Sequence, residues 1–207
     1  IQDIEEKHKG KTLNENQRHL LSSKLGLWPW VPNEIKQLWE EKILCFLELF
    51  SFAETREEFP TDDIKLLVAA EACLLISKRD FSDYRFLRSI HVWENQIPRQ
   101  PGAHGMASMC EVHLSWKYLE KTIGNGSDGQ NLVLHEFAHV IDFSDDGKAQ
   151  SIPVPRTSKD YEFWEDLVSD MHQKIVSAHA SGAEFPVRSY AGLQCDKGLT
   201  PEIFSCG

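Results

Sequence analysis

The segment NLVLHEFAHVIDF, which starts at Asn131, carries two histidines and a glutamate at a spacing that suits a metal ion. His135 and His139 are four residues apart, so in an α-helix they project from one face with about 6 Å between them, and Glu136 lies on the next row. This is the HExxH arrangement. Neutral imidazole is a good zinc ligand, and bound zinc lowers the pKa of its water to about 7. The motif therefore predicts one catalytic zinc ion held by His135 and His139, with Glu136 as the base that activates the water.

The residues around the motif are mostly apolar, which favours the interpretation of the two histidines as metal ligands. In a buried apolar helix, two imidazoles without partners would carry a desolvation cost, and a shared metal ion removes the need for separate partners. The alternative is a structural helix in which HExxH occurs by chance. The apolar neighbours are Leu132, Val133, Leu134, Phe137, Ala138, Val140 and Ile141.

A catalytic zinc ion needs a third protein ligand, which the spacing alone does not identify. Asp142 lies seven residues after His135 and hence on the same helix face. It also lies a further turn beyond His139, which suits a side chain that orients an imidazole better than one that binds the metal. Downstream, Glu184 and Glu202 are the carboxylate candidates.

Charge and hydropathy exclude two classes of partner. The chain has 22 Lys and Arg against 32 Asp and Glu, a net charge of −10, so we expect no direct contact with nucleic acid. The longest apolar stretches are interrupted by Glu48 or Glu71 and are shorter than the roughly 20 residues that cross a bilayer. The opening residues carry no export signature, and the five cysteines form no CxxC pair. We expect a soluble cytoplasmic protein.

The order of hydrophobic patterns predicts an α+β fold in a single metallopeptidase domain over 1–207. Residues 1–59 form a helical N-terminal part, and residues 60–207 form the catalytic part. Amphipathic helices are expected from Thr12, Asn33, Thr61, Asn131 and Asp160 onwards. Between about residues 84 and 116, short aromatic and β-branched pieces predict a small mixed or antiparallel sheet beside the metal-bearing helix.

Two features of this strand region stay open. The piece VHLSW is either a sheet edge, to which an extended peptide can add as a strand, or ordinary sheet core. A lone histidine is more often a hydrogen-bonded structural residue than a ligand, so we expect no role in the site for five of them. These are His91, His104, His113, His172 and His179.

Ordered blocks from about Thr61 to Phe204 resemble the Mlc titration factor A family of bacterial zinc peptidases, whose architecture is related to that of gluzincins. The blocks are TDDIKLLVAAEACLLI, VHLSW, GQNLVLHEFAHVIDF, SYA and PEIF. The resemblance implies a zincin-like, mainly helical fold. Because the family continues with an apolar helix where this chain reads EIFSCG, we expect a shortened C-terminus.

The resemblance also implies a role for each matching residue. His135 and His139 correspond to the zinc-binding histidines and Glu136 to the catalytic glutamate. Glu202, in PEIF, matches the third zinc ligand. Tyr190, in SYA, matches a tyrosine that assists catalysis, where a phenol can donate a hydrogen bond to a developing oxyanion.

Three functions follow as hypotheses. The first is an aminopeptidase-like zinc peptidase that acts on peptide substrates. The second, implied by the resemblance, is a regulatory protein that binds a transcriptional repressor of sugar uptake. The third is a metal-free relative that keeps the fold for binding.

Overall fold

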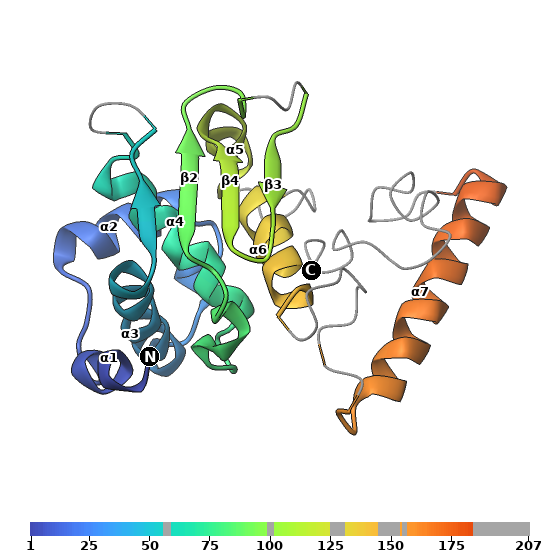
Figure 1. Ribbon diagram of the computed structural model, residues 1–207, viewed down its shortest axis with the longest axis horizontal. Helices are drawn as coiled ribbons and strands as arrows, with labels where there is room; N and C mark the ends of the chain where they lie inside the picture. The colour runs from blue at the N-terminus through green and yellow to red at the C-terminus, as the bar shows by residue number, and fades with distance from the viewer. Residues whose placement is uncertain (56–58, 99–101, 125–130, 145–153, 155–156, 184–207) are drawn as a thin grey trace.

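The computed structural model describes residues 1–55, 59–98, 102–124, 131–144, 154 and 157–183 (Figure 1). Within them the chain is mainly helical with one small sheet, which confirms the α+β prediction. The helices are α1 (Gln2–His8), α2 (Glu15–Lys24), α3 (Asn33–Leu49), α4 (Asp62–Leu75), α5 (Trp116–Thr122), α6 (Leu132–Asp142) and α7 (Tyr161–Ser181), with 3-10 turns η1 (Trp28–Trp30) and η2 (Phe81–Tyr84). The strands are β1 (Ser51–Ala53), β2 (Ser89–Trp93), β3 (Gly105–Ala107) and β4 (Glu111–Ser115).

Helices α2 and α3 pack on α4, and α3 does so through an apolar face that the sequence pattern predicts. On α3, Trp39, Ile43 and Phe46 are buried, and the Trp39 indole donates a hydrogen bond of 2.8 Å to the carbonyl of Ala70 on α4. The Thr61 hydroxyl caps α4 by accepting from the Ile64 amide at 3.4 Å, as expected from a threonine before an acidic first turn. These helices form one side of the core.

The sheet has the order β1-β2-β4-β3, so β3 lies at the edge of the sheet although β4 follows it in the sequence. β1, β2 and β4 run parallel, and β3 runs antiparallel to β4. The sheet is therefore mixed. The piece VHLSW supplies most of β4, which lies between β2 and β3, so its interpretation as a sheet edge is wrong and the sheet-core alternative is confirmed. The edge strand on that side is β3.

The two faces of the sheet differ in burial. Ile90 and Val92 of β2, and Val112 and Leu114 of β4, are buried and belong to the same hydrophobic core as residues of α4 and α6. Because side chains alternate along a strand, the intervening residues point to the opposite face, where they are partly or largely exposed, apart from the buried Ser115. One face thus supports the helices, and the other carries polar and aromatic side chains.

Helix α7 stands apart from the sheet, on the side of α6 (Figure 1). It begins after Asp160, as predicted, and ends at Gly182, whose φ of 68° suits glycine. Among all described helices, none combines the length and apolar character that crossing a membrane requires. Glu184, Tyr190 and Glu202 lie outside the described residues, so their roles remain predictions.

Candidate metal centre

The two histidines of the motif lie together on α6. The ring centroids of His135 and His139 are 5.0 Å apart, and the rings are nearly perpendicular, at 82°. Both side chains are partly exposed, whereas the neighbouring Phe137 and Ala138 are buried. The predicted helix and its apolar face are therefore confirmed, and the histidines lie on its accessible face.

The electrostatic setting keeps His139 in the form that binds metal. Burial, and to a smaller extent the nearby His135, lowers the pKa of His139 to about 4. The ring is therefore neutral at physiological pH and retains a free lone pair, as metal ligation requires. Two adjacent imidazoles on one face, one of them held neutral, fit a zinc ion.

Glu136 lies between the motif helix and the edge strand. It is 4% exposed, and a methyl group on Gly105 of β3 would lie 2.6 Å from its Cδ and 2.7 Å from its Cγ. Atoms at such distances overlap, so only glycine at position 105 allows the carboxyl group to occupy this place. The candidate base is thus seated directly beside the backbone of β3.

The N-terminus of α6 is fixed by a residue that bonds in two directions. Asn131 Oδ1 accepts from the Leu134 amide at 2.9 Å, which caps the helix. Its Nδ2 donates to Oε1 of Glu71 on α4 at 2.7 Å. Burial raises the pKa of Glu71 to about 7, and the bond from Asn131 opposes this rise. Glu71 and Asn131 together set where α6 begins.

An aromatic cluster holds the opposite side of α6. The ring centroid of Phe137 lies 5.3 Å from that of Tyr84 and 5.7 Å from that of Phe46 on α3. The Tyr84 hydroxyl donates to the Ala72 carbonyl at 2.8 Å, which ties the cluster to α4. Asp142, at the last position of the helix, is 2% exposed, and its predicted role in orienting an imidazole stays a prediction.

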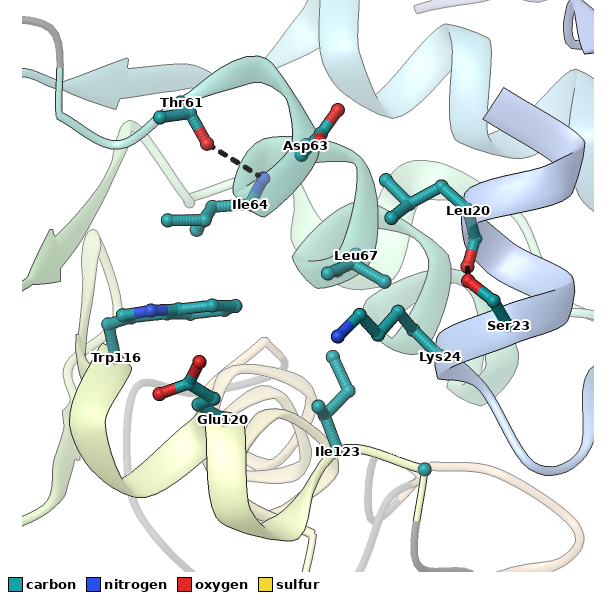
Figure 2. A pocket seen from close by; sticks show the side chains of 11 residues that line it. Leu20, Ser23, Lys24, Thr61, Asp63, Ile64, Leu67, Trp116, Glu120 and Ile123 are labelled. Carbon is teal, nitrogen blue, oxygen red and sulfur yellow. Dashed lines mark hydrogen bonds between the residues drawn. The ribbon is translucent and has the colours of Figure 1, made fainter. Parts of the chain in front are cut away.

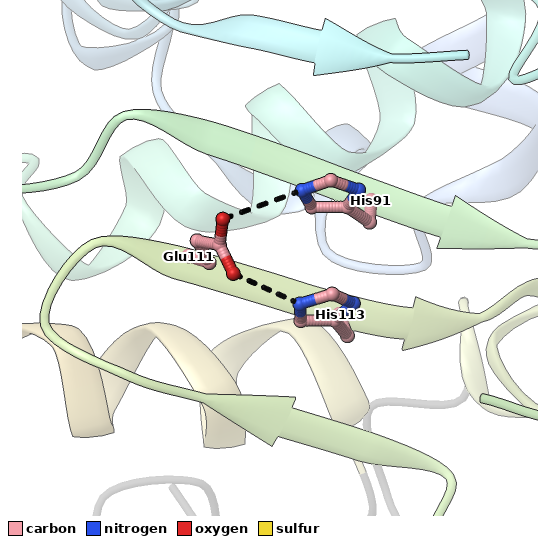
Figure 3. Close-up of side chains that lie close together, drawn as sticks. All are labelled: His91, Glu111 and His113. Carbon is pink, nitrogen blue, oxygen red and sulfur yellow. Dashed lines mark hydrogen bonds and ion pairs between the residues drawn. The ribbon is translucent and has the colours of Figure 1, made fainter. Parts of the chain in front are cut away.

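A second histidine and glutamate group lies in the sheet, where the sequence predicted none. His91 on β2 lies opposite His113 on β4, and Glu111 is close to both (Figure 3). The i, i+2 spacing of Glu111 and His113 signals a shared face of a strand. Their meeting with His91 depends on which strands pair, and single-sequence patterns do not specify that.

A cavity of about 470 Å³ opens between α2, α4 and α5 (Figure 2). Leu67 and Trp116 contribute apolar surface to it, and Lys24, Asp63 and Glu120 contribute charge. None of its lining residues belongs to the HExxH motif or to the histidine and glutamate group of the sheet. This cavity is therefore separate from both.

Comparison with known proteins agrees with the geometry of α6. The chain is 25% identical over 174 residues to an uncharacterized protein of Synechocystis sp., an alignment that covers 76% of this chain and 63% of that protein. The chain thus spans less than two thirds of the length of this relative. The family described as glucose-regulated metallo-peptidase M90 matches residues 2–195, and it includes Mlc titration factor A. The chain belongs to this family of glucose-regulated metallopeptidases.

Proposed function

We propose that the chain is a zinc-dependent, aminopeptidase-like peptidase. The observation that supports this most directly is the arrangement on α6. His135 and His139 present perpendicular imidazoles 5.0 Å apart, and the buried Glu136 lies against β3. Glu202 is proposed as the third ligand and Tyr190 as a hydrogen-bond donor to the oxyanion.

The chemistry of this proposal is peptide-bond hydrolysis. A zinc ion bound by His135, His139 and Glu202 would supply Lewis acidity and would lower the pKa of a water molecule. Glu136 takes a proton from the attacking water and delivers it to the leaving amine, so its carboxyl group must cycle between its two protonation states. Its low exposure reduces competition from bulk water for that proton.

The edge strand β3 is the proposed substrate guide. The Ser115 amide donates to the His104 carbonyl at 2.8 Å, and the Ser108 amide donates to the Glu111 carbonyl at 2.8 Å. In an antiparallel pair the bonding alternates, so the backbone groups of Gly105 and Ala107 point away from β4. An extended peptide can pair with these groups by strand addition, which carries its backbone past Glu136.

The deciding experiment compares hydrolysis of amino-acid anilides by wild type, Glu136→Gln and His139→Ala, with bound zinc measured in each. Glu136→Gln should retain zinc and lose activity by a factor of about 100 or more, the usual effect of removing a general base. His139→Ala should lose zinc and activity together. Glu34→Gln, at an exposed glutamate in the first turn of α3, is the matched control and should behave as wild type. Equal rates in wild type, Glu136→Gln and a chelated sample would exclude the proposal.

A second candidate function is regulatory binding of a transcriptional repressor of sugar uptake. The observation that favours it is the description of the family as glucose-regulated. Fluorescence anisotropy with a labelled, purified repressor of this class tests it. Binding of equal strength to wild type and Glu136→Gln would establish a role independent of catalysis, whereas an unchanged anisotropy at saturating protein would exclude it.

A further inference from the structure

The face of the sheet that points away from the core carries two histidines and a glutamate within reach of one cation. The register pairs His91 with His113, and Glu111 with Ser89, so these residues share one face of the parallel pair β2 and β4. The ligand atoms of His91, Glu111 and His113 all lie within 4.8 Å of one another. Figure 3 shows the three side chains turned toward a common space.

The separations are close to those of a zinc site. His113 Nε2 lies 3.5 Å from Glu111 Oε2, and His91 Nε2 lies 4.0 Å from Glu111 Oε1. Ligands of a tetrahedral zinc ion, with bonds near 2.0–2.2 Å, are about 3.3–3.5 Å apart. The imidazole rings are stacked at 4.4 Å and 8°, so rotation about a Cβ–Cγ bond is needed to turn both lone pairs to one point.

We propose that His91, Glu111 and His113 form a second binding site for a divalent cation of the zinc class, separate from the HExxH centre. Two imidazoles and a carboxylate are ligands that zinc, nickel and copper accept, whereas magnesium and calcium prefer oxygen alone. Glu111 is half-exposed, so water can complete the coordination. An ion here joins β2 to β4 and stabilises the sheet that carries β3.

Trp93 gives the site an internal reporter. Its indole N–H donates to Nδ1 of His113 at 3.1 Å, so in the neutral ring the proton resides on Nε2. For a metal ion to bind at Nε2 of the neutral ring, its single N–H proton must move to Nδ1, where it ends the bond from Trp93. Metal binding at Nε2 therefore changes the environment of the Trp93 indole, and it competes with the hydrogen bond from Trp93 to His113.

The alternative explanation is that His91, His113 and Trp93 form a structural ladder, a stack of rings across β2 and β4 that binds no metal. His91, His113 and Trp93 lie in nearly parallel planes; the two histidine ring centroids are 4.4 Å apart, and the Trp93 centroid lies 6.2 Å from each of them. Stacked rings on neighbouring strands stabilise a sheet without any ligand. A structural ladder predicts no metal stoichiometry, so the two explanations differ in a direct measurement.

The test uses the full chain carrying His135→Ala and His139→Ala, which removes the HExxH site. After equilibration with zinc and dialysis, metal analysis should give one ion per chain. Adding Glu111→Gln or His91→Ala should reduce this to none, while adding His19→Gln, at an exposed histidine of α2, should leave it at one. Circular dichroism checks that each variant is folded.

A further variant distinguishes a metal site from a structural ladder. Trp93→Phe removes the competing hydrogen bond, so zinc should bind about tenfold more tightly in the same background, the factor that one neutral hydrogen bond of about 1.4 kcal/mol represents. Zinc should also raise the melting temperature of the Trp93-containing chain and change its indole emission. Absence of zinc from the His135→Ala, His139→Ala chain, or zinc that persists in full after Glu111→Gln, overturns the proposal. Neither result bears on the peptidase proposal, which depends on α6.

Discussion

Gly105 and Glu136 lie so close that a single methyl group at position 105 would overlap the glutamate side chain. Gly105 belongs to the edge strand β3, and Glu136 belongs to α6, so this contact joins the proposed substrate guide to the proposed base. The absence of a side chain at one position therefore determines where the carboxyl group lies.

Gly105→Ala should displace Glu136 and reduce kcat/KM on the order of 100-fold, the effect that a shift of about 1 Å produces in a catalytic group. Zinc content should stay unchanged, because the substitution removes neither His135 nor His139. Gly10→Ala is the control: its φ of 73° disfavours alanine, and no atom approaches its Cβ position. It should lower stability and leave kcat/KM as in wild type. An active Gly105→Ala variant would show that the contact is not needed for catalysis.

Ala107→Pro tests the guiding role of β3. The N–H of Ala107 points away from β4, so proline removes a donor to the substrate and leaves the ladder intact, as edge strands permit. KM should rise roughly tenfold, the effect of one lost hydrogen bond, with a smaller change in kcat. Met106→Pro is the contrasting variant, because the N–H of Met106 points toward β4 and its loss should lower the melting temperature. Equal KM values for Ala107→Pro and wild type would argue against strand addition.

Glu71→Gln should change how stability depends on pH. Burial raises the pKa of Glu71 from 4.5 to about 7, so the folded chain binds more protons than the unfolded chain between these values. The contribution of this group is therefore greatest below pH 4.5 and is lost as the pH rises through about 7. At 1.36 kcal/mol per unit, the difference is on the order of 3 kcal/mol.

The measurement is urea unfolding of wild type and Glu71→Gln from pH 5 to pH 8. Glutamine keeps an acceptor for Asn131 Nδ2 and carries no charge, so the variant should be more stable than wild type at pH 8 and nearly equal to it at pH 5. A stability difference that does not vary with pH would show that Glu71 does not titrate in this range.

Glu40→Ala should destabilise the N-terminal part of the fold. Glu40 is 4% exposed and accepts from the Leu13 amide at 2.9 Å and from Arg18 Nε and Nη2 at 2.9 Å and 2.8 Å. Its removal leaves a buried amide without an acceptor, and we expect a loss of about 2–3 kcal/mol in urea unfolding. Asp170→Ala breaks an exposed i,i+4 pair with Lys174 and should cost about 0.5 kcal/mol or less. Similar losses for the two variants would contradict the importance of the buried carboxylate.

Local patterns predicted the helices α2, α3, α4, α6 and α7 because their signals lie within a few residues, whereas the short helices α1 and α5 were not expected. The cap at Thr61, the helix that begins after Asp160 and the apolar surroundings of His135 and His139 are all found in the structure. A helix was expected from Asn131 onwards, and the Asn131 side chain does cap α6. The α+β class follows from the same signals.

The sheet was harder to predict because strand pairing joins residues far apart in sequence. His91 and His113 are 22 residues apart, and only the parallel pairing of β2 with β4 places them together. The position of β3 at the edge, with β4 inside, likewise depends on topology rather than on composition. The contact between Gly105 and Glu136 was also hard to predict, because it joins the edge strand β3 to α6, a helix that follows β4 in the sequence.

Phe137 lies on the helix roughly 200° from both His135 and His139, since each is two residues away at about 100° per residue. Its packing against Phe46 and Tyr84 therefore fixes the roll of α6 about its own axis. Affinity for zinc at the proposed site and resistance to heat would then share one structural origin, and a variant that loosens this ring should lose both over the same temperature range. Selection for a more heat-resistant form of the protein through this contact would, for the same reason, also tighten zinc binding at the proposed site.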